Sequence, residues 1–329
     1  MRAKRYHGLT RDAAPKPVVR RGEVLQARPD LEPIWREAHE AFPVLVTRSL
    51  WGRMDPHDPN DPIARQVLPD ARELDAHPAA LADPVGEKAH SPLPWVIHKH
   101  PDRVLLMATK RCHVYCRFCF RRTHAPSERL DPSPEEWDAA LDYARSSGAS
   151  EVILSGGDPL VLSDEKLSLT LGALQGAVPT VRVHTRAPIS SPDRVTEGLI
   201  RVLRQAPAAW VVVHCNHSAE LSAEVTDALA RMVDSGIPVL NQSVLLKGVN
   251  DDPEVLAELS ENLVKRRVFP YYLHHTDRVE GTSHFWVSAE RGRVIFDQLS
   301  KRVSGLALPK YVWDPPDGTG KKAVSSETP

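Results

Sequence analysis

Three cysteines lie within eight positions of one another, in the pattern C-x3-C-x2-C at Cys112, Cys116 and Cys119. The chain has only one other cysteine, Cys215, which lies far downstream. Thiolates are the usual ligands of iron–sulfur clusters and of zinc. Three thiolates would leave one iron of a cubane cluster without a protein ligand, and an open metal position is where a small molecule can bind and react. The spacing therefore indicates a metal site that carries out chemistry.

Two other sites could use the same thiols. A zinc site of three cysteines and one histidine is possible because His113 and His124 are close in sequence. An electron-transfer cluster normally has four cysteines, and only Cys215 could supply the fourth. We favour a catalytic cluster with an open iron over both alternatives.

Composition narrows the class of protein. The chain has 329 residues, 41% of them hydrophobic, and a formal net charge of −1, so it has no overall attraction to nucleic acid or to an anionic membrane. No apolar run approaches the ~20 residues of a membrane helix, and so few cysteines favour a reducing cytoplasm over a disulfide framework. The basic residues near the N-terminus lack the apolar core of a secretory signal, and we expect them to form a solvated tail. They are Arg2, Lys4, Arg5, Arg11, Lys16, Arg20 and Arg21.

The elements that must position the thiols alternate between short apolar runs and longer amphipathic segments. This alternation predicts an α/β fold with a parallel sheet, and six such units suggest a partial (β/α)6 TIM-like barrel. The predicted strands are Val104–Thr109, Glu151–Ser155, Thr180–His184, Trp210–His214, Pro238–Gln242 and Phe269–Leu273. The predicted helices are Pro134–Ser147, Asp164–Gln175, Asp193–Gln205, Ala219–Ser235, Pro253–Lys265 and Ser288–Val303.

Three regions are predicted along the chain. Residues 1–95 form a small, mainly helical N-terminal region with one clear helix at Leu31–Ala41, residues 96–305 form the barrel, and residues 306–329 form a C-terminal segment without a helix. Polar residues follow the predicted strands, among them Ser155-Gly-Gly-Asp158, His184, His214, Gln242 and Asp277. Because active residues of such barrels lie at the carboxyl ends of the strands, we expect these residues to converge with the cysteines.

The cysteine motif after a first strand, with the aromatic Phe118 before its last cysteine, resembles that of the radical S-adenosylmethionine enzymes. In that superfamily the open iron binds S-adenosylmethionine, and one electron from a [4Fe-4S] cluster cleaves it to a 5′-deoxyadenosyl radical. Gly156-Gly157-Asp158-Pro159, together with Ser155, is similar to the superfamily's glycine-rich segment. Glycines would allow close approach of backbone to the methionine end of S-adenosylmethionine.

From about Phe42 to Val324 the chain resembles the lysine 2,3-aminomutase family. The segments that carry the resemblance are Asn60–Val67, Gly86–Pro92, His98–Val104, Asn241–Leu246 and Pro270–Leu273. Members of this family are isomerases that also use pyridoxal 5′-phosphate, and they move an amino group from the α to the β carbon of an amino acid. The resemblance implies conversion of L-lysine to β-lysine with a flavodoxin- or ferredoxin-type reductant, and it leaves open whether the protein is a homo-oligomer.

The resemblance also implies roles for individual residues. Lys321 corresponds to the lysine that binds pyridoxal phosphate covalently. The sequence register counted from Asp314 favours Lys321 over Lys322. Arg121 corresponds to the arginine that binds the substrate carboxylate. The remaining roles go to Lys99 and Arg103 for the phosphate, to Asp277 and Asp314 for the substrate ammonium, and to His214 and Gln242 for S-adenosylmethionine.

Some features leave the function open. Family members with a structural zinc site carry cysteines after the pyridoxal lysine and in the segment that here reads Asn250-Asp251-Asp252, so we expect no such zinc. The compact C-terminus resembles the branch that makes (R)-β-lysine for elongation factor P, and another substrate such as arginine stays possible. A radical enzyme without pyridoxal phosphate and a non-catalytic cluster protein are the competing classes.

Overall fold

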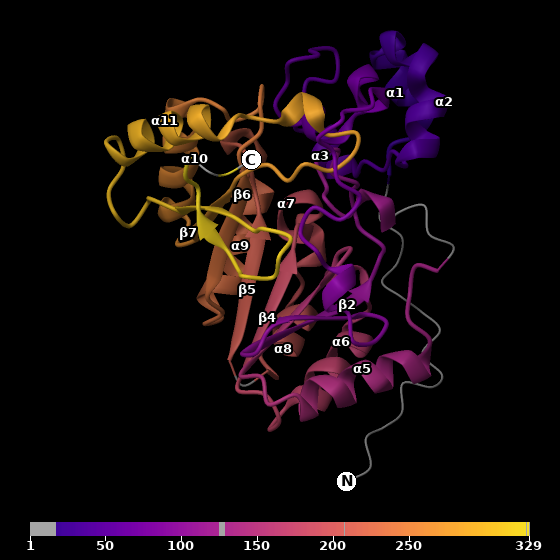
Figure 1. The fold of residues 1–329 in the computed structure, drawn as a ribbon, viewed down its shortest axis with the longest axis vertical. Coiled ribbons are helices and arrows are strands. Elements are labelled where there is room, and N and C mark those ends of the chain that lie inside the picture. Colours follow the sequence, from indigo (N-terminus) through magenta and orange to yellow (C-terminus); the bar gives the residue numbers. More distant parts are fainter. Residues whose placement is uncertain (1–17, 125–128, 207, 327, 329) are drawn as a thin grey trace.

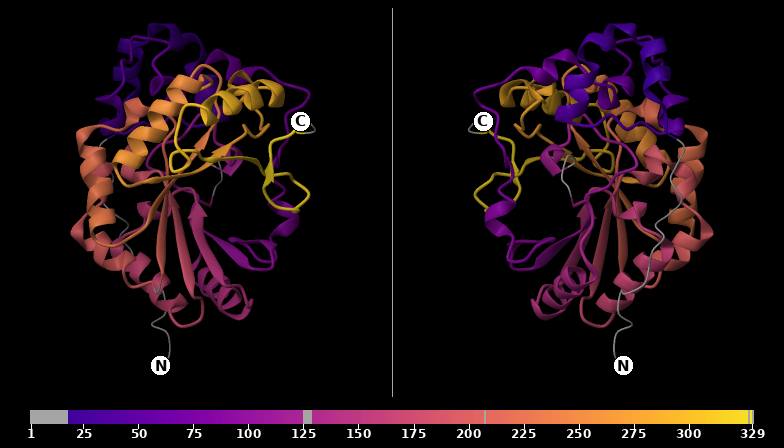
Figure 2. Two further views of the ribbon diagram at one scale, coloured as in Figure 1. Left: turned by 90° about the vertical axis from the view of Figure 1, so that its left-hand side faces the viewer. Right: turned by 90° about the vertical axis from the view of Figure 1, so that its right-hand side faces the viewer.

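The fold is known from a computed structural model, which describes residues 18–124, 129–206, 208–326 and 328. Most of the expected basic tail, Arg2, Lys4, Arg5, Arg11 and Lys16, lies outside the described residues. The remainder is an α/β structure in which one strongly curved sheet is backed by helices on its outer side (Figures 1 and 2). None of the helices in the described ranges is both long enough and apolar enough to span a membrane.

The nine strands of this sheet follow one another in chain order across it. Neighbouring strands from β2 to β8 run parallel, and β1 and β9 are antiparallel edges. Because β1 does not pair with β9, the barrel is partial, as the sequence predicts. The strands are β1 (Val96–His100), β2 (Arg103–Thr109), β3 (Glu151–Gly156), β4 (Thr180–Thr185), β5 (Ala209–His214), β6 (Val239–Val244), β7 (Phe269–His274), β8 (Lys310–Trp313) and β9 (Lys322–Ala323).

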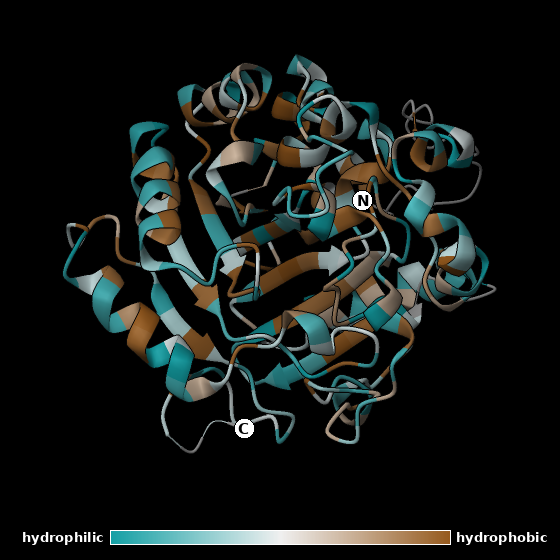
Figure 3. Ribbon diagram, turned by 90° about the horizontal axis from the view of Figure 1, so that it is seen from above, coloured by the Kyte–Doolittle hydropathy of each residue, from teal (hydrophilic) through white to brown (hydrophobic). Residues whose placement is uncertain are grey.

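The long helices from α5 onward cover the outer face of the sheet (Figure 3), and buried hydrophobic residues of α5, α6, α8, α9 and α10 share one core with the strands. Each long helix begins after a serine or aspartate N-cap, whose side-chain oxygen accepts a backbone N–H of the first turn. The helices are α1 (Arg21–Ala27), α2 (Glu32–Ala41), α3 (Arg48–Trp51), α4 (Ala64–Val67), α5 (Pro134–Ser146), α6 (Asp164–Leu174), α7 (Ala187–Ser190), α8 (Glu197–Leu203), α9 (Ala223–Asp234), α10 (Pro253–Lys265) and α11 (Ala289–Ser300).

The structure differs from the sequence prediction in several helices. The N-terminal region has α1, α3 and α4 beside the one predicted helix. The helix predicted at Ala219–Ser235 begins later, because Ser218–Glu220 forms a 3-10 turn and Ser222 caps α9. The predicted helix Asp193–Gln205 is shorter, because Pro192 starts a separate 3-10 turn and Thr196 then caps α8 by accepting from the Leu199 N–H.

The sheet has more strands than the six predicted. β1 precedes the predicted set, and β8 and β9 extend the sheet into the Pro- and Gly-rich C-terminal segment. Strands this short have too few residues for a visible alternating pattern. The prediction that no helix follows Leu308 holds in the described residues.

The N-terminal region packs on the loops that follow β4 and β5. It has its own small hydrophobic core, which includes Trp35, Leu50 and Ile63 and reaches Val114 and Cys116 in the cysteine loop. The Thr47 hydroxyl donates to the Ser190 carbonyl at 2.5 Å. This region therefore lies over the carboxyl ends of the strands, where the predicted site residues lie.

Candidate active site

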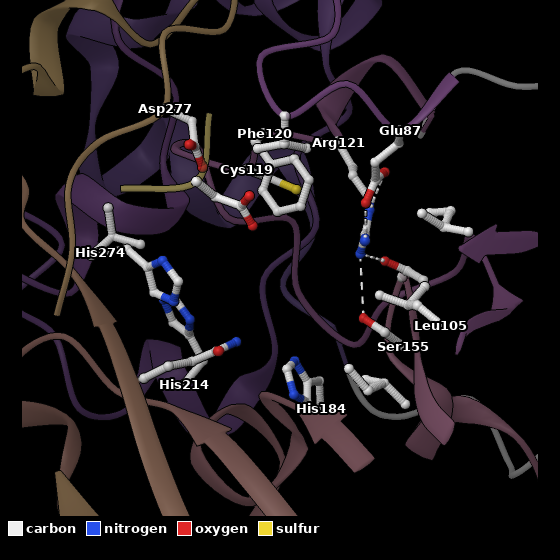
Figure 4. Close-up of a pocket in the computed structure, with 18 of the residues that line it drawn as sticks. Glu87, Leu105, Cys119, Phe120, Arg121, Ser155, His184, His214, His274 and Asp277 are labelled. Carbon is white, nitrogen blue, oxygen red and sulfur yellow. Dashed lines mark hydrogen bonds and ion pairs between the residues drawn. The ribbon is translucent and has the colours of Figure 1, made fainter. Parts of the chain in front are cut away.

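The curved sheet encloses a cavity of about 740 Å³, which is within the usual range for small-molecule sites. Its strand residues alternate along the chain, for example Arg182 and His184 on β4 and Tyr272 and His274 on β7, so one face of each strand points inward (Figure 4). Every site residue predicted from the sequence lines this cavity. These residues are Lys99, Arg103, Cys112, Cys116, Cys119, Arg121, Ser155, Gly156, Gly157, Asp158, His214, Gln242, Asp277, Asp314 and Lys321.

The three cysteines of the motif are free thiols in the loop that follows β2. Burial raises the pKa of Cys112 well above its ordinary value and that of Cys119 to about 11. In the described residues, no group of three or more His, Cys, Asp or Glu side chains is arranged to hold a single metal ion. A cubane cluster makes a different demand, because each thiolate binds a different iron. Three free thiols on one cavity wall fit such a cluster.

The cysteine loop is held by the N-terminal region. The backbone N–H of Tyr115 donates to the Leu45 carbonyl at 3.1 Å, and that of Arg117 donates to the Gln66 carbonyl at 2.8 Å. The Arg117 side chain is completely buried and shares the carboxylate of Glu73 with Arg122. Because a buried charge needs a paired partner, this ion-pair cluster fixes the loop between the second and third cysteines.

The glycine-rich segment has a structural role that the sequence did not suggest. A Cβ on Gly157 would lie 2.2 Å from the Arg111 carbonyl oxygen, and one on Gly156, whose φ is +120°, would lie 2.3 Å from the Thr109 carbonyl oxygen. Because neither glycine has a side chain, the start of the cysteine loop can pack directly against this segment. The Asp158 carboxylate accepts from the Thr185 hydroxyl and the Arg186 N–H, so it ties the ends of β3 and β4 together.

Three histidines on the cavity wall are neutral. Burial lowers the pKa of His184 well below its ordinary value, and it lowers those of His214 and His274 to about 3. The buried Nε2 atoms of His184 and His214 have no hydrogen-bond partner in the described part of the chain. Unpaired buried polar atoms are costly, so both rings fit a polar ligand. His214 stacks on Phe118 and is the register neighbour of Gln242, which agrees with one shared ligand for this pair.

Two carboxylates form the opposite wall with Lys321. Burial, and then the charge of Asp314, raises the pKa of Asp277 to about 7. Burial alone would also raise the pKa of Asp314, but Lys321 and Lys99 outweigh it and hold that pKa below its ordinary value. The Lys321 Nζ lies 3.1 Å from an Asp314 oxygen, whereas Lys322 does not line the cavity and lies 3.7 Å from Asp317.

Lys99 and Arg103, the two residues predicted to bind phosphate, have different partners in the structure. The ammonium of Lys99 donates to the Val85 carbonyl at 2.6 Å and to Asp314 at 3.1 Å. Its donors therefore join the N-terminal region to the C-terminal loop in this structure. Arg103 pairs with Asp102, whose side chain is 60% exposed, and exposed pairs of this kind are weak enough for a phosphate to replace.

Arg121 already has a carboxylate partner. Its Nε donates to Glu87 Oε2 at 2.8 Å, its Nη2 donates to the other oxygen of Glu87, and its Nη1 donates to the Gly156 carbonyl at 3.1 Å (Figure 4). Burial alone would lower the pKa of Arg121, but the Glu87 charge outweighs it and raises that pKa. A substrate carboxylate would have to share or replace the Glu87 contact.

Sequence reasoning missed several residues that line or support the cavity. Glu87 lies in the Gly86–Pro92 segment, but nothing in its spacing shows that it pairs with Arg121. His274 ends β7 and Arg186 follows β4. The predicted strands end at Leu273 and His184, so His274 and Arg186 lie one and two positions beyond a predicted strand end.

Comparison with known proteins gives a consistent result. Residues 106–259 match the Radical SAM superfamily. The chain is 41% identical over 284 residues to an L-lysine 2,3-aminomutase of Clostridium subterminale, covering 85% of this chain and 68% of that protein. It is 40% identical over 280 residues to an L-lysine 2,3-aminomutase of Escherichia coli, covering 84% and 81%. It is 38% identical over 293 residues to that of Methanococcus maripaludis, covering 88% and 68%.

Proposed function

The chain belongs to the lysine 2,3-aminomutase family of radical S-adenosylmethionine enzymes, and we propose that it converts L-lysine to β-lysine with the help of pyridoxal phosphate. Family membership makes the protein a radical aminomutase, an isomerase, and implies a [4Fe-4S] cluster and S-adenosylmethionine. The substrate, pyridoxal phosphate and the roles of individual residues are the proposed part.

The observation that carries the substrate assignment is the carboxylate pair Asp277 and Asp314. The pair already holds a lysine ammonium, that of Lys321, at 3.1 Å from Asp314. When Lys321 is bound covalently to pyridoxal phosphate, this ammonium no longer balances the pair. Lys99 then stays on Asp314, but this one cation does not balance two partly buried carboxylates, which repel each other. The side-chain ammonium of a lysine substrate would restore the balance.

The other residues orient the substrate around this contact. Arg121 is placed to bind the substrate carboxylate, and the Glu87 pair keeps its guanidinium fixed and charged. Lys99 holds Asp314 and the loop that carries Lys321. Arg103 faces the cavity with an exchangeable partner, so we assign the phosphate chiefly to Arg103.

The cysteine wall is proposed to generate the radical. Cys112, Cys116 and Cys119 would hold the cluster, and His214, through its unpaired Nε2, would bind S-adenosylmethionine together with Gln242. When bound, the cluster supplies the electron that cleaves S-adenosylmethionine, and pyridoxal phosphate carries the migrating amino group. The protein's part is to hold both reactants in one water-poor cavity, so that the β-hydrogen of the substrate meets the adenosyl radical.

The test is an anaerobic assay of the reconstituted full chain with S-adenosylmethionine, pyridoxal phosphate and a chemical reductant. Separate reactions contain L-lysine, L-arginine or L-glutamate. We expect β-lysine from lysine and no turnover of glutamate, whose side chain carries the same charge as the carboxylate pair. Turnover of arginine instead of lysine would move the assignment to another cationic substrate. Turnover of glutamate alone would contradict it.

A further inference from the structure

Arg186 follows β4 and contacts the second cysteine of the motif. Its side chain is only 6% exposed, and its Nη1 donates to the Sγ of Cys116 at 2.7 Å. The same guanidinium lies over the ring of Phe118, 5.5 Å from the ring centre. A fixed positive charge is thus in direct contact with a proposed cluster ligand.

A buried polar network holds this charge in place. The Nη2 of Arg186 donates to Gln66 Oε1 and Glu220 Oε2, each at 2.7 Å. Glu220 is completely buried and also accepts the backbone N–H of Asn216 at 2.8 Å. Because Gln66 comes from the N-terminal region and Glu220 from the loop after β5, the network joins two regions behind the cysteine loop.

Both charged groups of the pair stay ionised. The guanidinium of an arginine stays protonated in proteins. Burial raises the pKa of Glu220, but Arg186 outweighs it and lowers that pKa overall. In the described residues, the buried Nε of Arg186 has no hydrogen-bond partner. Arg186 therefore keeps one donor for an acceptor that the protein does not supply.

We propose that Arg186 is a positioning residue that raises the reduction potential of the cluster through its hydrogen bond to Cys116, with Glu220 as its counter-charge. Hydrogen bonds to the sulfurs and solvent exposure are known to set the potentials of iron–sulfur clusters. Reduction adds one electron and makes the cluster more negative by one charge. A nearby cation stabilises the reduced form more, and this effect is strong where water is absent.

This role rests on the assignment of the three cysteines to a cluster, and it does not depend on the amino acid substrate. A raised reduction potential affects two steps in opposite directions. A higher potential makes the cluster easier for a low-potential one-electron donor to reduce. It also leaves less driving force for the cleavage of S-adenosylmethionine.

The experiment is a redox titration of the anaerobically reconstituted full chain, followed by the paramagnetic signal of the reduced cluster, without S-adenosylmethionine. In Arg186→Gln we expect the ratio of reduced to oxidised cluster at a fixed potential to fall at least tenfold, which corresponds to about 59 mV for a one-electron couple. In Glu220→Gln we expect a change in the opposite direction, because the counter-charge is lost while Arg186 stays.

A matched control is Arg194→Gln. Arg194 is also a buried arginine, but it donates to the Leu160 and Leu162 carbonyls and does not line the cavity. The reduction potential of the cluster in Arg194→Gln should match that of the wild type. A merely structural role for Arg186 would lower the amount of cluster without moving its potential.

The outcomes separate this inference from the proposed function. An unchanged potential in Arg186→Gln with the cluster intact would overturn the role of Arg186. If Arg186→Gln holds no cluster, Glu220→Gln decides, and a potential that is unchanged or lower in that variant overturns the inference. A wild-type protein without any cluster signal would instead contradict the cofactor assignment itself.

Discussion

The two walls of the cavity differ in how their charges are balanced. Behind the cysteine wall, Glu73 is paired with Arg117 and Arg122, and Glu220 is paired with Arg186, which reaches the cavity. On the opposite wall Asp277 has a pKa of about 7, a sign that its charge is not compensated there. The first wall is complete before any substrate arrives, and the second needs a cation.

This difference fits the two tasks of a radical aminomutase. Radical generation is the same for every substrate, so its residues can be fixed by internal pairs. Substrate selection requires a site whose charges are satisfied only by the correct ligand, because unpaired groups reject the wrong one. The two walls should therefore respond differently to mutation.

The largest effect is expected at Lys321, the lysine proposed to anchor pyridoxal phosphate. Lys321→Ala should lose both the bound pyridoxal absorbance and the aminomutase activity, because the other lysine beside Asp314, Lys99, is already held by the Val85 carbonyl and by Asp314. Lys322→Ala is the matched control and should keep both, since Lys322 lies outside the cavity next to Asp317. Absorbance and β-lysine formation are measured on the same preparations. Loss of both in Lys322→Ala alone would reverse the assignment of the two lysines.

The next effect is on stability and belongs to the cysteine wall. Glu73→Gln leaves Arg117 and Arg122 buried without their carboxylate, and breaking a buried ion pair in this way costs about 3–5 kcal/mol. Urea unfolding of the protein measures the loss. Glu254→Gln removes a pair with Arg302 in which the glutamate is 73% exposed, and it should cost no more than about 1 kcal/mol. Equal losses of unfolding free energy in the two variants would contradict a larger contribution from the buried ion pairs of Glu73.

A smaller effect is expected on substrate binding. Asp277→Asn removes one charged partner of the substrate ammonium, and a hydrogen bond to a charged group is worth about 1.5–3 kcal/mol, or roughly 10- to 100-fold in KM for lysine. Asp317→Asn, at a position outside the cavity, is the control and should leave KM unchanged. Cleavage of S-adenosylmethionine without substrate should be unaffected in both variants. A change in that cleavage would contradict the separation of the two walls.

A last effect is a pH dependence of stability in the protein without cofactor or substrate. The pKa of Asp277 is raised from 3.8 to about 7, so the folded state binds a proton that the unfolded state releases. The stability that this proton provides is fully present below about pH 4 and is lost as pH rises through about 7. Asp277→Asn should therefore be more stable than the wild type at pH 8 and no more stable at pH 4. Urea unfolding at both pH values checks the sign, and a variant less stable at pH 8 would contradict it.

The sequence predicts the α/β class, the six central strands and part of the cavity lining, because strand ends and motif spacing are local features. Arg121, Asp314 and Lys321 are reached only through the family resemblance. The sequence does not predict the pairing of Arg121 with Glu87 or of Arg186 with Cys116 and Glu220. These partners lie 34 to 70 residues apart in the chain, and only the curvature of the sheet brings them together. The division into regions 1–95, 96–305 and 306–329 stays a prediction.

The most direct test of the account follows a hydrogen atom from one wall to the other. The reconstituted enzyme is incubated with S-adenosylmethionine, pyridoxal phosphate, a reductant and L-lysine that carries deuterium at the β carbon. Mass spectrometry then measures deuterium in 5′-deoxyadenosine and in recovered S-adenosylmethionine. If the cysteine wall and the lysine wall form one reaction site, deuterium appears in these adenosyl products together with β-lysine. Cleavage of S-adenosylmethionine without any transfer of deuterium would contradict the account.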